Sequence, residues 1–167
     1  MRDGCVQMTG RADKAANLAQ VESLVARAAE QGADLDGLRI GLTICYDVRF
    51  PEFDCVLALA GAQLPTVPAN FVAHTGKDHW ETPLRARGID NQCDVAAPAR
   101  IGVVFPDRPP AYSRSLIVAP WGVVPVTAGD EETVIVGHID MARVDTMRAA
   151  LPALRHRRPE TYRWPDR

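Results

Sequence analysis

Apolar residues recur along the chain with two different periods. Between residues 38 and 44 they alternate with polar residues or glycine, a period of two that predicts a β-strand ending just before Cys45. Between Asp13 and Gly32 they recur every three or four positions, which predicts an amphipathic helix closed by the glycine. The face expected to pack on the core consists of Leu18, Val21, Leu24, Val25, Ala28 and Ala29.

The remaining apolar runs are shorter and are separated by glycine and proline. Further strands are predicted at residues 4–8, 62–68, 94–99 and 133–139, and helices at 53–60, 80–89 and shortly after 141. A turn at 119–122 joins strands 115–118 and 123–126 in a predicted hairpin, and residues 70–77 and 105–110 are expected to be loops. Strands that alternate with helices predict a layered α/β fold with parallel connections.

Length and charge set broad limits on the protein. The 167 residues, 47% hydrophobic and 24% charged, predict one globular domain over residues 1–167. A net charge of −2 indicates no particular partner. No apolar run approaches the roughly 18 residues that cross a bilayer, and the amino terminus lacks a signal-peptide pattern. We therefore expect a cytoplasmic protein with no nucleic-acid and no membrane partner.

The cysteines and histidines are dispersed. The four cysteines include no C-x-x-C pair. The four histidines are not spaced as zinc ligands typically are. We expect reduced thiols, no metal and no cofactor. Cys45 differs from the others because it follows a predicted strand directly, and strand-to-helix turns expose side chains to pockets. The spacing alone leaves two interpretations open, a nucleophile or an inert buried thiol.

Seven short segments are similar to segments of one known family, and they occur in the same order. They are residues 44–52 (ICYDVRFPE), 57–62 (LALAGA), 68–71 (PANF), 79–81 (HWE), 85–92 (RARGIDNQ), 115–122 (SLIVAPWG) and 154–159 (LRHRRP). In this order they resemble the nitrilase, or carbon-nitrogen hydrolase, superfamily. The HWE and HRRP segments are most similar to the branch that contains deaminated glutathione amidase and omega-amidase.

The resemblance implies a fold and a chemistry. The fold is an α/β, nitrilase-like α-β-β-α sandwich, four-layered on dimerisation and incomplete here by an internal deletion. The chemistry is hydrolysis of a small amide substrate by a glutamate, a lysine and a cysteine, in a homo-oligomer. Cys45 matches the catalytic cysteine. The same resemblance suggests that the following residues bind substrate or support the cysteine turn: Tyr46, Asp47, Arg49, Glu52, Asn70 and Phe71.

The chain departs from the family at the other two catalytic positions. The family places its glutamate and lysine before the cysteine turn, where this chain runs from Asp34 to Leu38 without room for either. Its two lysines, Lys14 and Lys77, do not match. Substitute bases are available in principle, namely Glu52, Glu81, Asp47, His74 and His79. Three hypotheses follow: an impaired amidase, a non-catalytic shortened homologue that acts as a binding or subunit-contacting module, and a cysteine-histidine hydrolase.

Overall fold

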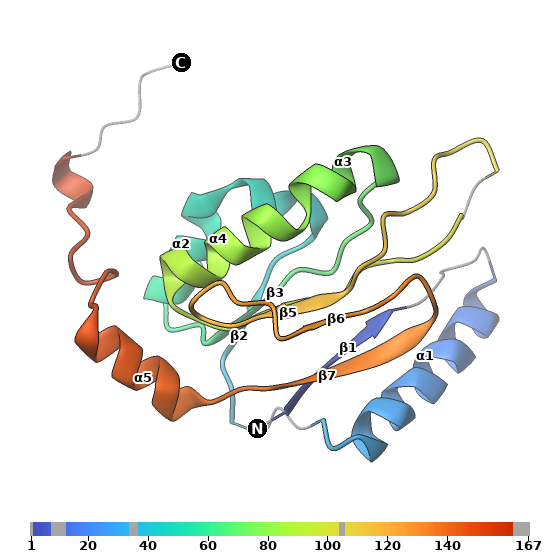
Figure 1. Cartoon of the computed structure of the whole chain (residues 1–167), viewed down its shortest axis with the longest axis horizontal. Coiled ribbons are helices and arrows are strands. Elements are labelled where there is room, and N and C mark those ends of the chain that lie inside the picture. The colour runs from blue at the N-terminus through green and yellow to red at the C-terminus, as the bar shows by residue number, and fades with distance from the viewer. Residues whose placement is uncertain (1, 8–12, 34–36, 104–105, 162–167) are drawn as a thin grey trace.

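The computed structural model describes residues 2–7, 13–33, 37–103 and 106–161 (Figure 1). Its strands are β1 (Arg2–Gln7), β2 (Ile40–Leu42), β3 (Leu64–Thr66), β4 (Val95–Ala97), β5 (Leu116–Val118), β6 (Val126–Thr127) and β7 (Thr133–His138). Its α-helices are α1 (Lys14–Glu30), α2 (Pro51–Leu59), α3 (Ala73–His79), α4 (Glu81–Asn91) and α5 (Met141–Ala150). Short 3-10 helices occupy Cys45–Arg49 and Pro159–Thr161.

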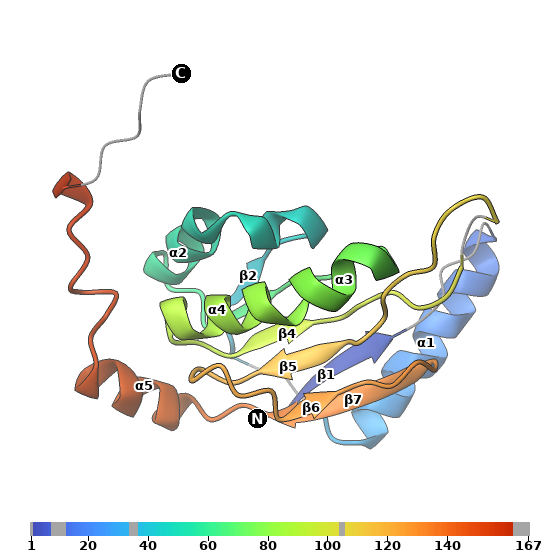
Figure 2. The ribbon, with the colours of Figure 1, turned by 45° about the horizontal axis from the view of Figure 1, so that its top comes forward.

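The described strands form two sheets. One has the order β2-β3-β4-β5-β6, with parallel pairing from β2 to β4 and antiparallel pairing from β4 to β6. The other pairs β1 antiparallel with β7. Helices α2, α3 and α4 lie on one face of the larger sheet, and the smaller sheet covers part of the other, with α1 outside it (Figures 1 and 2). The expected α-β-β-α sandwich is therefore confirmed, with its layers all in one chain, whereas the expected dimerisation stays a prediction.

Two apolar clusters hold the layers together. Between the sheets, Cys5 and Ile135 pack against Leu64, Ala96 and Ile117 of the larger sheet. On its helical face, a second cluster includes Val48, Phe71, Trp80, Leu84, Val95 and Val118. None of the helices in the described ranges combines the length and apolar character needed to cross a membrane.

Part of the predicted apolar surface is exposed. On α1, Leu24 and Ala28 are buried, whereas Leu18 and Val25 are each 53% exposed, so the expected core face of this helix is only half covered. The cause is the small width of the sheet that α1 packs on. Its two described strands contact the helix through Val6, Val134 and Val136.

Strand β2 carries a second uncovered surface. Its Gly41 faces α2, because a Cβ there would meet Ala62 and Leu57. The alternating side chains Ile40 and Leu42 lie on the opposite face and are 41% and 73% exposed. The buried residues of the larger sheet that pack on the smaller sheet come from β3, β4 and β5. Alternation correctly predicted the strand but not that its apolar face would be exposed.

The expected loop at residues 70–77 is partly wrong, because its second half forms α3. This helix has no side-chain hydrogen bond at its N-cap, Val72, and its sequence carries no apolar stripe. Contacts distant in sequence fix it instead: the Ala73 amide donates to Pro110 O at 3.0 Å, and Gly76 is buried against the Tyr112 side chain. Sequence periodicity is insensitive to a helix of this kind.

Candidate active site

Cys45 occupies a sharp turn between β2 and α2. Its amide donates to Pro68 O at 2.8 Å, beyond the end of β3, and Thr43 Oγ1 donates to Thr66 O at 2.9 Å. Cys45 then opens the 3-10 helix with φ +49°, in the left-handed region that non-glycine residues rarely adopt. Backbone strain of this kind concentrates at functional sites, where the neighbouring structure enforces it. The predicted place of Cys45, just past the strand, is correct, although β2 ends at Leu42.

The Cys45 side chain is half-buried against the helical core. It packs on the cluster that contains Val48, Phe71 and Trp80. The other three cysteines are buried, with exposed fractions of 5% or less. Cys45 is therefore the thiol best placed to meet a reagent or substrate.

Asp47 holds the turn in shape. Its Oδ2 accepts a hydrogen bond from the Ile44 amide at 2.9 Å, and its own amide donates to Ile44 O at 3.0 Å. The Asp47 carboxylate is therefore hydrogen-bonded to the backbone that precedes Cys45. This contact gives Asp47 a capping role that supports the cysteine turn.

The other candidate bases point to different partners. Glu81 pairs with Arg85 at 3.5 Å, and His79 Nδ1 lies 3.3 Å from Arg49 Nη1. His74 is exposed on α3, and Glu52 is exposed at the start of α2. Within the described ranges, none of the five candidates hydrogen-bonds to the Cys45 thiol.

Arg49 is the cation nearest to the turn in sequence. Its guanidinium carbon lies 5.2 Å from the ring centres of both Tyr46 and Phe71, a cation-π distance. Its Nε is buried without a hydrogen-bond partner. Phe71 in turn packs on Trp80, with ring centres 5.1 Å apart. Arg49 therefore joins the cysteine turn to the residues after β3.

Two of the predicted site residues, Glu52 and Asn70, line other clefts, and Tyr46 is the exposed member of the Arg49 group. Tyr46 is 63% exposed beside Phe50, and Asn70 lines a separate cleft with Arg100 and Arg108. Glu52 lines another cleft, which Cys45 does not line. Lys14 begins α1 on the outside of the smaller sheet, and Lys77 is exposed on α3. The structure thus groups Tyr46, Arg49 and Phe71, keeps Asp47 in the same turn, and places Glu52 and Asn70 at two other clefts.

Sequence reasoning missed a buried charge beside the site. Asp54 of α2 is fully buried, and its Oδ2 lies 3.9 Å from Arg87 Nε of α4. Neither of its carboxyl oxygens has a hydrogen-bond partner. Burial raises the pKa of Asp54 to about 6, while the attraction of Arg87 opposes this rise. The one sign of this buried charge in the sequence is the position of Asp54 beside Cys55, within the helix predicted at 53–60.

Residues 34–149 match the model of the carbon-nitrogen hydrolase family. The chain belongs to this family. It is 43% identical over 118 residues to deaminated glutathione amidase of Synechocystis, which covers 71% of this chain and 43% of that protein. It is 45% identical over 124 residues to the nitrilase and fragile histidine triad fusion protein NitFhit of Caenorhabditis elegans, covering 74% of this chain and 28% of that protein. The predicted superfamily and branch are confirmed.

Solved structures show the same fold. The crystal structure of C. elegans NitFhit matches with a TM-score of 0.71 and 44% identity, over 74% of this chain and 30% of that one. The NitN amidase of Nesterenkonia sp. AN1 matches with a TM-score of 0.80 and 19% identity, over 96% of this chain and 98% of that one. This carbon-nitrogen hydrolase homologue spans less than half the length of the two curated relatives.

Proposed function

We propose that this chain is a carbon-nitrogen hydrolase that cleaves a small carboxamide through Cys45, at a reduced rate. The observation that carries the proposal is the left-handed, half-buried cysteine between β2 and α2, within the region that matches the family. The two curated relatives described above include a deaminated glutathione amidase, which makes a small amide the substrate class to test. The chain acts as a single domain without a metal or cofactor.

The chemistry proceeds in two steps. The Cys45 thiolate attacks the amide carbonyl carbon, the C–N bond breaks, and the nitrogen leaves as ammonia after gaining a proton. Water then hydrolyses the thioester, which releases the carboxylic acid and restores the thiol. The described side chains supply the nucleophile and the cation of Arg49 nearby, but no base bonded to the thiol.

Two features of the site account for the reduced rate. The candidate bases are occupied elsewhere or exposed, so proton removal from Cys45 depends on solvent. Of the two lysines, Lys14 begins α1, and Lys77 is exposed on α3, where it pairs with Asp78. The resemblance implies that the family's lysine stabilises the oxyanion, and loss of one such donor typically lowers kcat on the order of a hundred- to a thousandfold. We therefore expect slow turnover rather than none.

Ammonia release tests this proposal. With a panel of small ω-amides, the purified protein is expected to release ammonia, and intact mass spectrometry is expected to detect the acyl adduct. Cys45→Ala should lose both signals, whereas Cys55→Ala, which removes a buried thiol, should keep them. Folded protein that releases no ammonia, or a Cys45→Ala variant that is equally active, would contradict the assignment.

The outer face of α2 favours a second role, as a subunit-contacting module. Phe53, Val56 and Leu59 on this helix are 41%, 61% and 58% exposed, although all three are apolar. Exposed apolar patches of this kind mark contact surfaces, and a homodimer would cover this one. The role does not require catalysis, so it applies equally to a non-catalytic homologue.

Light scattering after size-exclusion chromatography tests the contact. The protein is expected to elute as a dimer, and Val56→Glu should shift it to a monomer, because a charge cannot be buried there without a partner. Val25→Glu on α1, at a site of similar exposure, is the matched control and should leave the dimer intact. A monomeric wild-type protein would exclude this role.

A further inference from the structure

The cleft that Glu52 lines is formed by α2 and α4 on one side and by α5 and the segment after it on the other. Its volume is about 480 Å³, within the usual range for small-molecule sites. It is bordered by the start of α2, the end of α4, the turn after β5, and α5 with the segment that follows it. Cys45 does not line it, so it is distinct from the candidate active site.

An unpaired carbonyl oxygen in the wall of this cleft points to a ligand. Gln92 lines the cleft and is 3% exposed. Its Nε2 donates to Leu151 O at 2.6 Å, which fixes the orientation of the amide. The other amide atom, Oε1, is buried without a hydrogen-bond partner. A buried acceptor left in this state typically costs about 1–3 kcal/mol, and an incoming donor removes that cost.

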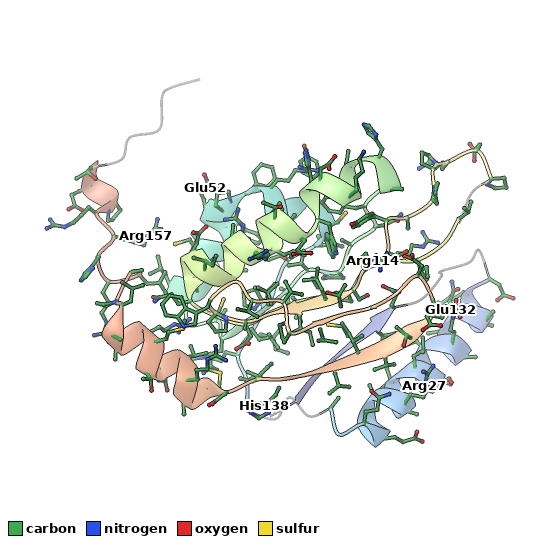
Figure 3. The ribbon with its side chains drawn as sticks, in the orientation of Figure 1. Arg27, Glu52, Arg114, Glu132, His138 and Arg157 are labelled. Atoms are coloured by element: carbon green, nitrogen blue, oxygen red, sulfur yellow. The ribbon has the colours of Figure 1, made fainter. Side chains whose placement is uncertain are left out.

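Two opposite charges also border the cleft and have no ion-pair partner among the described residues. Glu52 lies on α2, and Arg157 lies on the segment after α5 (Figure 3). Asp90, the third charged residue of the lining, is already paired with Arg87 at 3.3 Å. The cleft therefore offers one free carboxylate and one free guanidinium.

The rest of the wall is largely apolar. Trp121 and Ile89 line the cleft and are 53% and 48% exposed, while Met147 is buried at its base. An exposed indole provides a flat surface on which an apolar or aromatic group can pack.

We propose that this cleft binds a small zwitterion that carries an ammonium group, a carboxylate and an apolar body, as a free apolar amino acid does. The ammonium group donates to Gln92 Oε1 and pairs with Glu52. The carboxylate pairs with Arg157, for which a planar fork of N–H donors is suited. The apolar body packs on Trp121. The site is independent of the Cys45 chemistry.

Isothermal titration calorimetry with three probes tests the proposal. Phenylalanine is expected to bind, whereas phenylalaninamide, which lacks the carboxylate, and N-acetylphenylalanine, which lacks the ammonium group, should each bind at least about tenfold more weakly, because each loses one charge-assisted contact. Equal binding of all three probes, or no binding of phenylalanine, would overturn it.

Glu52 and Arg157 are both exposed, so variants of these residues test binding without disturbing the folded core. Glu52→Gln and Arg157→Gln should each weaken phenylalanine binding at least about tenfold. Arg158→Gln is the matched control, because Arg158 does not line the cleft and pairs with Glu160. Cys45→Ala should bind phenylalanine undiminished, so that failure of the amidase assignment and failure of this site are distinguishable. Insensitivity to both charge variants would show that the cleft does not recognise the zwitterion.

Discussion

Iodoacetamide at pH 8 is expected to alkylate Cys45 at least about a hundred times faster than Cys93. The reacting species is the thiolate, and burial raises the pKa of Cys93 to about 12, so that roughly one Cys93 thiol in ten thousand is ionised at this pH. Cys93 is also fully buried, whereas Cys45 is only half-buried. Peptide mapping by mass spectrometry at successive times measures the two rates.

Three controls sharpen this measurement. Cys5 and Cys55 are buried and should also react slowly in the folded protein. Cys45→Ala should remove the fast phase and leave the slow one unchanged. In 8 M urea the four thiols should react at similar rates, because the differences arise from folding. A fast phase that persists in Cys45→Ala would show that another thiol is the reactive one.

Asp54→Asn is expected to stabilise the protein by about 3 kcal/mol at pH 7, since two pKa units correspond to about that free energy. The folded-state pKa of Asp54, about 6, lies above its ordinary value of 3.8. The folded state therefore binds the extra proton between these values, and the stability of the wild-type protein falls as the pH rises from about 4 to about 6. Above pH 6 the penalty is complete, and asparagine avoids it.

Urea denaturation at pH 4.5 and pH 7 measures this effect. The stability difference between Asp54→Asn and wild type should be small at pH 4.5 and largest at pH 7. Asp90→Asn is the matched control, because it removes a more exposed carboxylate that contacts the same Arg87, and its effect should stay below about 1 kcal/mol. A wild-type protein that is more stable than Asp54→Asn at pH 7 would show that the Arg87 attraction outweighs the cost of burial.

Local patterns predicted most of the elements of the fold. The apolar period between Asp13 and Gly32 matches α1, and the Asp13 side chain caps it by accepting from the Ala15 and Ala16 amides. The predicted hairpin is present in part: β5 and β6 pair antiparallel, but the second strand is Val126–Thr127 rather than residues 123–126. The segment after residue 141 begins α5. These features depend on neighbours in sequence, which is the information that periodicity and capping carry.

The errors arose where distant contacts decide the structure. The exposure of Leu42 depends on how far the smaller sheet extends, and α3 depends on its contact with Tyr112. In the candidate site, the sequence located Cys45 and its turn, but it could not show that Asp47 caps the turn or that His79 faces Arg49. The burial of Asp54 and the cleft beside Gln92 are products of tertiary packing alone.

The pairing of β1 with β7 has a consequence for synthesis of the protein. The first strand ends at Gln7, and its partner begins at Thr133. At ribosomal rates of about 5–20 residues per second, β1 waits roughly 6–25 s before its hydrogen-bonding partner exists. All described strands of the larger sheet precede Thr133 in the chain, so they are synthesised before the smaller sheet has both of its strands. During that interval the inner face of the larger sheet lacks the partner strand that carries Ile135, one of the residues that cover it in the folded chain.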